Sequence, residues 1–271
     1  MSGALLEAGI VADVITVETR GDVDRTIPMY EMGSTGIFVD ELNRRVSSGE
    51  IDAAVHSAKD LPSIMPDDLE VSVVLKRENP LDALISRTAL DQMEPGSVIG
   101  TSSLRRKMEL LNYRNDLVTR NIRGNIDTRL SKLESGEYDG TILAVAALKR
   151  IGYEGRFEVL AGDSFVPAPN QGIIALVTRP GSPFSGRLPA VDHEDTRICF
   201  ENERRIMKSL GLGCSAPAGI FCSPGPSHSI TVLMFSRDGN VAERARFTPY
   251  DMLGLDDFIA HLEKKAARLG Y

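Results

Sequence analysis

Hydrophobic and polar positions follow two different periods along the first part of this chain. Residues 13–18 are rich in β-branched side chains in an alternating pattern, which predicts a strand. Phe38, Leu42 and Val46 are spaced four apart, which predicts an amphipathic helix. The apolar run at residues 51–62 then predicts a buried strand that ends in the polar loop HSAKDLP. Polar chemistry is therefore expected at the carboxyl end of this strand.

The alternation of strand and helix repeats in the middle of the chain. The predicted elements are a strand at 97–100, a helix at 101–113 with Ser and Thr caps, a strand at 116–122, a helix at 124–136 and an apolar strand at 141–148. Alternation of this kind is typical of the α/β class with largely parallel sheets.

A stretch rich in Pro, Gly and Ser follows and predicts a domain boundary near His193. Beyond it the pattern predicts a helix at 196–211, a β-hairpin with its turn at Asp238 and Gly239, and a final helix at 255–269. The carboxyl-terminal part is therefore predicted to be a small α+β domain.

Composition narrows the class of protein. With 271 residues the chain is long enough for two or three domains, and its longest apolar runs are far shorter than the roughly 20 residues of a membrane span. The amino-terminal residues carry Glu7 and Asp13 and no basic region, which is unlike a secretory signal, so a cytoplasmic protein is expected. Membrane partners are not expected.

Cysteine and histidine usage disfavours metal and disulfide chemistry. Cys199, Cys214 and Cys222 form an odd set without a CxxC pair, which argues against a disulfide framework and a structural zinc site. The four histidines lack the spacing of a helical metal site. No metal site is predicted, and all three thiols are expected to be reduced.

Charge is distributed unevenly along the chain. The formal net charge of −7 argues against nucleic-acid partners. Residues 101–150, however, hold ten Lys or Arg against six Asp or Glu, which leaves +4 inside an acidic protein. A local anionic partner would explain this excess.

The segment TSSLRR places Arg105 and Arg106 in the first turn of a helix, where cations oppose the macrodipole. A carboxylate or phosphate held by these side chains and by Thr101, Ser102 and Ser103 would relieve the conflict. A solvated basic helix end is an equally good explanation from this segment alone.

Further arginines fall where open α/β sheets bind ligands. Arg120 and Arg123 follow a predicted strand, Arg129 lies in the next helix, and Arg150 follows the last strand of this unit. The planar guanidinium matches a carboxylate bidentately, so the set suits a ligand that bears several carboxylates. Separate surface ion pairs are the alternative.

Two other segments carry candidate chemistry. Lys59 and Asp60 follow the buried strand, although an Asp before Leu-Pro is more often a loop or cap residue. His56, inside the apolar run, is predicted to be a core histidine. Cys214 is an unpaired cysteine, and such residues are commonly small buried hydrophobes. Gly211 and Gly213, however, would allow a tight loop that exposes its sulfur.

Four motifs, HSAKDLP, GTSSLRR, IRGNIDTRL and LGLGCSAPAG, occur in one order and closely resemble those of the porphobilinogen deaminase (hydroxymethylbilane synthase) family. The stretches ETRGD, KREN, LKRIG and NQGIIAL support the likeness, which extends over nearly the whole chain. The resemblance implies two doubly wound α/β domains like those of periplasmic binding proteins, plus a small α+β carboxyl-terminal domain. It places domain 1 at residues 1–77 and 172–193, domain 2 at 78–171 and the last domain at 194–271.

The resemblance also implies a reaction. A dipyrromethane cofactor is held on Cys214 by a thioether and primes the head-to-tail joining of four porphobilinogen molecules into hydroxymethylbilane, with Asp60 as the catalytic residue. By motif match the cofactor-binding residues are Cys214, Ser57, Lys59, Thr101, Ser102, Ser103, Arg105, Arg106, Arg123 and Gly124, and the substrate-binding residues are Arg129, Arg150, Arg120 and Gln171. The resemblance also implies a monomer whose partners are porphobilinogen and the growing polypyrrole.

Two departures from the family pattern are visible. The family begins with a strand and a GTRxS loop, whereas this chain begins at MSGALLEAG, so we expect its amino terminus to be incomplete. Many relatives also carry lysines where this chain has Thr35 and Asp40. A non-catalytic two-lobed binding protein and a thiol enzyme that uses Cys214 as a transient nucleophile are the alternative functions.

Overall fold

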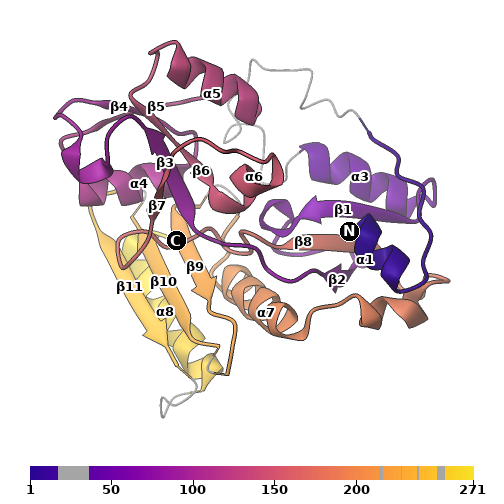
Figure 1. Cartoon of the computed structure of the whole chain (residues 1–271). Coiled ribbons are helices and arrows are strands. Elements are labelled where there is room, and N and C mark those ends of the chain that lie inside the picture. The colour runs from indigo at the N-terminus through magenta and orange to yellow at the C-terminus, as the bar shows by residue number, and fades with distance from the viewer. Residues whose placement is uncertain (18–36, 214–215, 227, 237, 249–253) are drawn as a thin grey trace.

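The part of the chain that the structure describes forms three β-sheets, each covered by helices (Figure 1). The computed structural model describes residues 1–17, 37–213, 216–226, 228–236, 238–248 and 254–271. In the described part of the chain, the sheets have the strand orders β1-β8-β2, β5-β4-β6-β3-β7 and β11-β10-β9. Strand numbers that are out of sequence order show that the chain leaves the first sheet, builds the second and returns.

The first sheet lies between two layers of helix. Val39 and Val46 of α3 and Phe200 of α7 pack on one face, and Leu5 of α1 and Leu188 of η3 pack on the other. Its strands are β1 (Ala53–Ser57), β2 (Glu70–Val74) and β8 (Ile174–Thr178), and its helices are α1 (Ser2–Glu7), α3 (Ile37–Ser47), η3 (Ser185–Ala190) and α7 (Glu194–Ser209).

The second sheet is built in the same way. Leu110 of α4 packs on one face, while Ile126 and Leu130 of α5 and Leu148 of α6 pack on the other. Its strands are β3 (Asp82–Ser86), β4 (Val98–Gly100), β5 (Val118–Arg120), β6 (Gly140–Ala144) and β7 (Glu158–Leu160), and its helices are η2 (Leu90–Gln92), α4 (Leu104–Tyr113), α5 (Ile126–Glu134) and α6 (Val145–Arg150). The predicted doubly wound α/β class is confirmed.

Strand direction differs from the largely parallel sheets predicted. β4 pairs in parallel with β5 and β6, but β3 runs antiparallel to β6 and β7, and β8 runs antiparallel to β1 and β2. β3 and β8 are the strands that follow each crossing between the two sheets, so the chain enters them from the opposite end. The hydrophobic periodicity of a local segment therefore cannot predict the direction of the strand that follows such a crossing.

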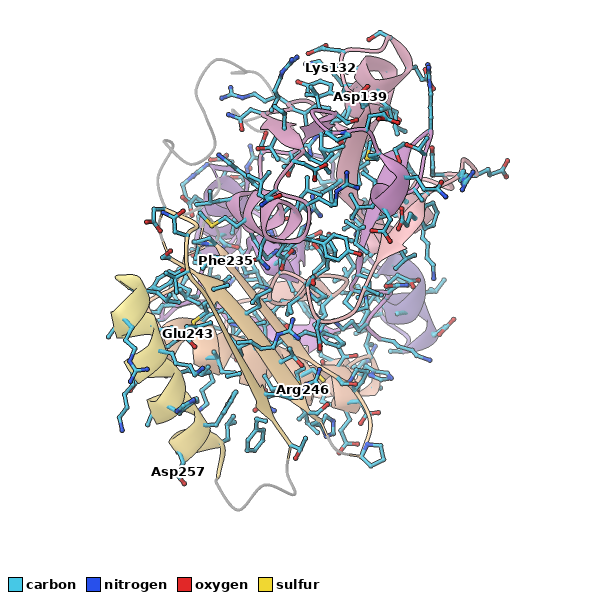
Figure 2. The ribbon with its side chains drawn as sticks, turned by 90° about the vertical axis from the view of Figure 1, so that its left-hand side faces the viewer. Lys132, Asp139, Phe235, Glu243, Arg246 and Asp257 are labelled. Atoms are coloured by element: carbon cyan, nitrogen blue, oxygen red, sulfur yellow. The ribbon has the colours of Figure 1, made fainter. Side chains whose placement is uncertain are left out.

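The third sheet is antiparallel and packs against two helices on one face. It consists of β9 (Ala218–Cys222), β10 (Ile230–Phe235) and β11 (Ala242–Phe247), with α8 (Leu255–Leu269) beside it. Figure 2 shows α8 along the sheet, with Asp257 near its start and Glu243 and Arg246 on β11. Phe235 and Leu233 face the other way and pack on Met108 of α4 and on Val166, so the third sheet contacts the second lobe.

Most predicted elements are present. The helices near residues 38–46, 101–113 and 124–136, the hairpin and the final helix are confirmed. The domain boundaries stay a prediction. Among the described residues, no helix combines the length and apolarity that a membrane span requires.

One predicted strand is confirmed only in its first half, and another is wrong. The apolar run at 141–148 is a strand only to Ala144, after which α6 begins, because an Ala-rich apolar run suits a buried helix as well as a buried strand. Residues 13–17 form no regular element, and Val14 and Ile15 are exposed at 75% and 66%. An alternating sequence makes a strand only where a neighbouring strand pairs with it. Glu18 lies outside the described residues.

Candidate active site

The loop after β1 presents Lys59 and Asp60 at the carboxyl end of the strand, as predicted. A short helical turn, η1 (Ala58–Asp60), carries both residues, and the buried side chains of Ala58 and Leu61 anchor it. His56, within β1, is buried, with Nε2 3.1 Å from Asn43 Oδ1, and burial lowers its pKa to about 4. It is the core histidine that the pattern predicted.

The Asp60 carboxyl reaches solvent and is nevertheless surrounded by protein. Asp60 is exposed as a residue. Desolvation nevertheless raises the pKa of its carboxyl group, and the positive charges of Lys59 and Arg150 offset this rise only in part. The protein atoms around the carboxyl group therefore desolvate it even though the residue as a whole is exposed. A raised pKa makes the carboxyl a better proton donor near neutral pH.

The three hydroxyl residues of the TSSLRR segment shape the start of α4. Ser103 is the N-cap, and its Oγ accepts the Arg106 amide at 3.5 Å. Ser102 Oγ donates to the Ile122 carbonyl at 2.7 Å, and Thr101 Oγ1 accepts the Ser103 amide at 3.2 Å. The Ser102 bond holds the β4–α4 loop beside the loop that follows β5, and the other two hydroxyls shape the start of α4 itself.

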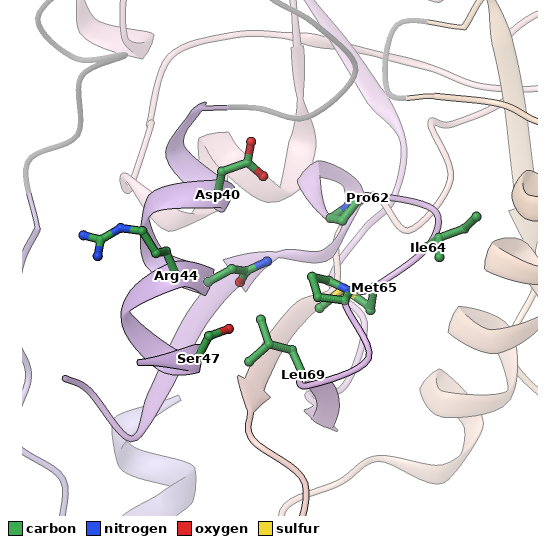
Figure 3. A pocket seen from close by; sticks show the side chains of 9 residues that line it. Asp40, Arg44, Ser47, Pro62, Ile64, Met65 and Leu69 are labelled. Atoms are coloured by element: carbon green, nitrogen blue, oxygen red, sulfur yellow. The ribbon is translucent and has the colours of Figure 1, made fainter. Parts of the chain in front are cut away.

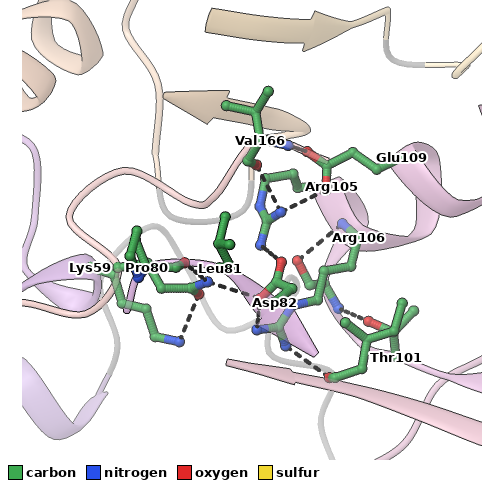
Figure 4. A network of polar contacts seen from close by, with 12 residues as sticks. Lys59, Pro80, Leu81, Asp82, Thr101, Arg105, Arg106, Glu109 and Val166 are labelled. Carbon is green, nitrogen blue, oxygen red and sulfur yellow. Dashed lines mark hydrogen bonds and ion pairs between the residues drawn. The ribbon is translucent and has the colours of Figure 1, made fainter. Parts of the chain in front are cut away.

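The anion that Arg105 and Arg106 require comes first from the protein itself. Asp82 Oδ2 accepts Arg105 Nη2 at 2.7 Å, and Asp82 Oδ1 accepts Arg106 Nη2 at 2.7 Å and Nε at 3.1 Å (Figure 4). Arg105 Nη1 also donates to Glu109 Oε2 at 2.6 Å and to the Val166 carbonyl at 3.0 Å. Arg105 is 3% exposed and Arg106 is 9% exposed.

Electrostatics follow from this packing. Burial acts to raise the pKa of Asp82, but Arg105 and Arg106 outweigh it and hold that pKa well below its usual range. Burial, helped by the negative charge of Asp82, raises the pKa of Glu109 to about 7 although Arg105 acts to lower it. Sequence reasoning missed both carboxylates. The signal was present, because Asp82 opens the strongly apolar strand DALIS and Glu109 lies four residues after Arg105.

Gln171 connects this network to the first lobe. Its Nε2 donates to Asp82 Oδ1 at 2.8 Å and to the Pro80 carbonyl at 2.7 Å, while its Oε1 accepts Lys59 Nζ at 3.5 Å. Burial first, and then the charge of Arg106, lowers the pKa of Lys59. The loop of the first sheet and helix α4 of the second therefore meet at one place.

The remaining cations come from the IRGNIDTRL segment and from α6. Gly124 has a φ of 107°, and a Cβ there would lie 2.6 Å from the Thr128 side chain, so the turn requires glycine. Arg129 Nε donates to the Gly124 carbonyl at 2.9 Å, and burial followed by the charge of Arg106 lowers the pKa of Arg129. Arg123 is half-buried.

Three predicted residues lie at the borders of this region. Arg150 ends α6, is exposed, and is close enough to Asp60 to affect its pKa. Arg120 is exposed at the end of the edge strand β5, and its backbone carbonyl accepts the Thr101 amide. Ser57 ends β1 and is half-buried.

Two further features concern the predicted departures and the thiol. A cavity of about 470 Å³ lies between α3 and the loop after Asp60, lined by Asp40, Asn43, Arg44, Ser47, Pro62, Ile64, Met65, Pro66 and Leu69 (Figure 3). Asp40 thus faces this cavity. Cys214 and Thr35 lie outside the described residues. Cys199 and Cys222 are buried, as predicted.

The charges of the site fit a ligand with several carboxylates. Lys59, Arg105, Arg106, Arg129 and Arg150 bring five positive charges together with Asp60, Asp82 and Glu109. The lowered pKa values of Lys59 and Arg129 show that these cations are poorly solvated and repelled by Arg106. Added carboxylates would relieve both costs. The donor set therefore suits dipyrromethane, whose pyrroles carry acetate and propionate groups.

Comparison with known proteins agrees with this chemistry. Residues 2–184 match the family model "Porphobilinogen deaminase, dipyromethane cofactor binding domain". A probable porphobilinogen deaminase of Picrophilus torridus is 49% identical over 213 residues, covering 79% of this chain and 76% of that protein. One of Methanosarcina mazei is 42% identical over 246 residues, covering 89% and 78%.

Solved structures give a much weaker likeness. The Bordetella pertussis BvgS periplasmic VFT2 domain is 16% identical, with a TM-score of 0.40 over 74% of this chain and 81% of that domain. The fold therefore rests on the topology described above. The family rests on the match over residues 2–184 and on the identity to these relatives: the chain belongs to the porphobilinogen deaminase family.

Proposed function

We propose that this chain is a hydroxymethylbilane synthase that deaminates four porphobilinogen molecules and joins them head to tail, as a step of tetrapyrrole biosynthesis. The observation that supports this best is the meeting of Asp60, a carboxyl with a raised pKa, with the cations of two lobes. A binding protein would need the cations but would have no use for a proton donor among them. We further propose a monomer that works in the cytoplasm.

Dipyrromethane, attached to Cys214 by a thioether, would supply the pyrrole carbon from which the product chain grows. Lys59 and Arg106 would hold its carboxylates together with Arg123, and the Thr101–Ser103 loop and Gly124 would form the adjoining wall. Arg129 and Arg150, with Arg120 at the border, would bind the carboxylates of incoming porphobilinogen. Fixed guanidiniums of this kind place the reacting carbon beside Asp60.

Asp60 would do the proton chemistry. Its protonated carboxyl donates a proton to the amine nitrogen of porphobilinogen, and ammonia leaves as the carbon–nitrogen bond breaks. The resulting carboxylate then accepts the pyrrole N–H and stabilises the positive charge that develops on the ring. The neighbouring charges of Lys59 and Arg150 favour this ionised form after the proton has left.

The attachment of the cofactor is tested by intact-protein mass spectrometry after expression in a host that makes porphobilinogen. Wild-type protein is expected to carry the mass of one dipyrromethane, and Cys214→Ser is expected to carry none. Cys199→Ser is the matched control, since it removes a buried thiol elsewhere and should keep the adduct. An adduct that persists in Cys214→Ser would refute the attachment, and an unmodified wild type would count against the function.

The role of Asp60 is tested separately. Asp60→Ala and Asp60→Asn should retain the adduct but lose turnover of porphobilinogen by roughly 10² to 10⁴-fold, the usual contribution of a general acid. The rate is measured as hydroxymethylbilane formed by protein of verified cofactor content. Near-normal bilane production by either variant would exclude Asp60 as the proton donor.

A further inference from the structure

We propose that Asp82 is a positioning residue of the anion-binding site: it fixes the spacing of Arg105 and Arg106 and, through Gln171, the place of Lys59. Asp82 lies outside the four sequence motifs. The inference deepens the proposed function and rests on it only for the identity of the ligand. It concerns how the chain holds its cations before any carboxylate arrives.

Both carboxylate oxygens of Asp82 accept hydrogen bonds from neighbouring side chains. The residue is 4% exposed and accepts four side-chain hydrogen bonds, three from the two arginines and one from Gln171. Each oxygen is assigned to a different arginine, since Oδ2 takes Arg105 and Oδ1 takes Arg106. The carboxylate therefore sets the distance between the two guanidiniums as a rigid template.

The position of Asp82 in the fold makes it a link between lobes. It is the first residue of β3, where the chain enters the second sheet, and Lys59 follows β1 of the first sheet. Gln171 lies in the segment that returns to the first sheet and contacts both. A shift of Asp82 would therefore move cations on both sides of the site together.

Asp82 also leaves part of Arg106 available. Arg106 uses Nε and Nη2 on Asp82 and Nη1 on the Ile142 carbonyl at 3.0 Å, and its side chain stays 10% exposed. A guanidinium has five N–H donors, so at least one can still meet a carboxylate. Arg105 has a 4% exposed side chain that also binds Glu109 and the Val166 carbonyl, and it is linked to Arg106 through Asp82.

An alternative is that Asp82 only competes with ligand carboxylates for the guanidiniums. The two roles predict opposite effects of neutralising it. If Asp82 positions the arginines, Asp82→Asn binds carboxylates more weakly, because the cations lose their arrangement. If Asp82 competes, the same variant binds them more tightly, because net positive charge rises.

The test uses a tricarboxylate probe, citrate, on protein expressed without porphobilinogen. The rise in unfolding midpoint with citrate is measured for wild type, Asp82→Asn and Asp82→Glu. Asp192→Asn is the matched control, since Asp192 also pairs with an arginine and a backbone amide, Arg197 and Val74, and lies outside the site. We expect wild type and Asp192→Asn to respond alike.

Both Asp82 variants should bind citrate roughly tenfold more weakly, the size expected when charge-assisted hydrogen bonds are lost. On protein from a porphobilinogen-making host, mass spectrometry should show reduced cofactor occupancy in Asp82→Asn. Kinetics of the loaded fraction should show a raised KM with a smaller change in kcat. Asp82→Glu keeps the charge, so it separates misplacement of the arginines from loss of their counter-ion.

Three results would overturn the proposal. Tighter citrate binding by Asp82→Asn would assign the competing role, and wild-type citrate binding by a folded Asp82 variant would show that spacing does not matter. Failure of both variants to fold would show that Asp82 serves the fold rather than the site. Because citrate binding needs neither cofactor nor turnover, an inactive wild type would refute the proposed function and leave this result standing.

Discussion

Two buried charge networks lie at the junctions between the sheets, and they are built differently. One joins Asp82, Arg105, Arg106 and Glu109 next to Lys59. The other pairs Arg77, which precedes the second sheet, with Glu203 of α7, and the side chains of this pair are 3% and 0% exposed.

The second network is closed. Arg77 donates to both oxygens of Glu203, to the Gln171 carbonyl and to the Cys222 carbonyl, and Glu203 also accepts the amides of Asn170 and Cys222. One cation pairs with one anion, and backbone carbonyls and amides make the other hydrogen bonds of both side chains. This arrangement ties both crossing segments to the third sheet and offers nothing to a ligand.

The first network is open by comparison. Its two arginines share Asp82, its second carboxylate has a pKa raised to about 7, and further cations lie near it with lowered pKa values. Buried charge that is not fully balanced is costly unless a partner of opposite charge arrives. Both networks are buried, so burial does not distinguish them. The neutralisation of charge within the network distinguishes the structural ion pair from the one in the binding site.

The largest effect is expected from breaking the closed network. Glu203→Gln leaves Arg77 buried without a counter-charge and should lower the free energy of unfolding by about 3 to 5 kcal/mol. Urea unfolding followed by circular dichroism measures it. The double variant Arg77→Met with Glu203→Gln should recover part of the loss, because no charge is then stranded.

An exposed pair provides the control for this experiment. Glu78 and Lys149 are 2.7 Å apart, but their side chains are 48% and 55% exposed, so Glu78→Gln should change the free energy of unfolding by less than about 1 kcal/mol. Equal losses in Glu203→Gln and Glu78→Gln would contradict the claim that the closed network holds the sheets together.

The sequence predicted elements that carry their own local signal. Ser103 before an amphipathic stretch located α4, and Gly136, with its φ of 79°, ended α5 as expected. Strand direction could not be predicted, because it depends on the crossings before β3 and β8. Residues 13–17 failed for the related reason that an alternating pattern does not specify a partner strand.

The candidate site was predicted on its basic side only. The arginines were recognisable because cations in the first turn of a helix need an anion, as at Arg105 and Arg106. Their actual partner, Asp82, is more than 20 residues away in sequence, and only the fold brings it within 2.7 Å. Short motifs therefore indicate a need for charge but do not show whether the protein or the ligand supplies it.

A smaller effect, in the open network, should depend on pH. Glu109 has a folded-state pKa of about 7, raised by burial from the ordinary value of 4.5, so the folded protein binds this proton more tightly than the unfolded chain. The contribution is fully present below about pH 4.5 and is lost as pH rises through about 7. Glu109→Gln, which cannot ionise, should lack this loss.

The measurement is the difference in the free energy of unfolding between wild type and Glu109→Gln at pH 5, 6, 7 and 8. We expect wild type to lose about 2 kcal/mol relative to the variant over this range, given that one pKa unit corresponds to about 1.4 kcal/mol. His56 titrates in both proteins and cancels. A difference that does not vary with pH would mean that Glu109 stays ionised and that Arg105 is fully balanced. The open network would then be as closed as that of Arg77 and Glu203, and the surplus of positive charge would have to come from Lys59, Arg129 and Arg150 alone.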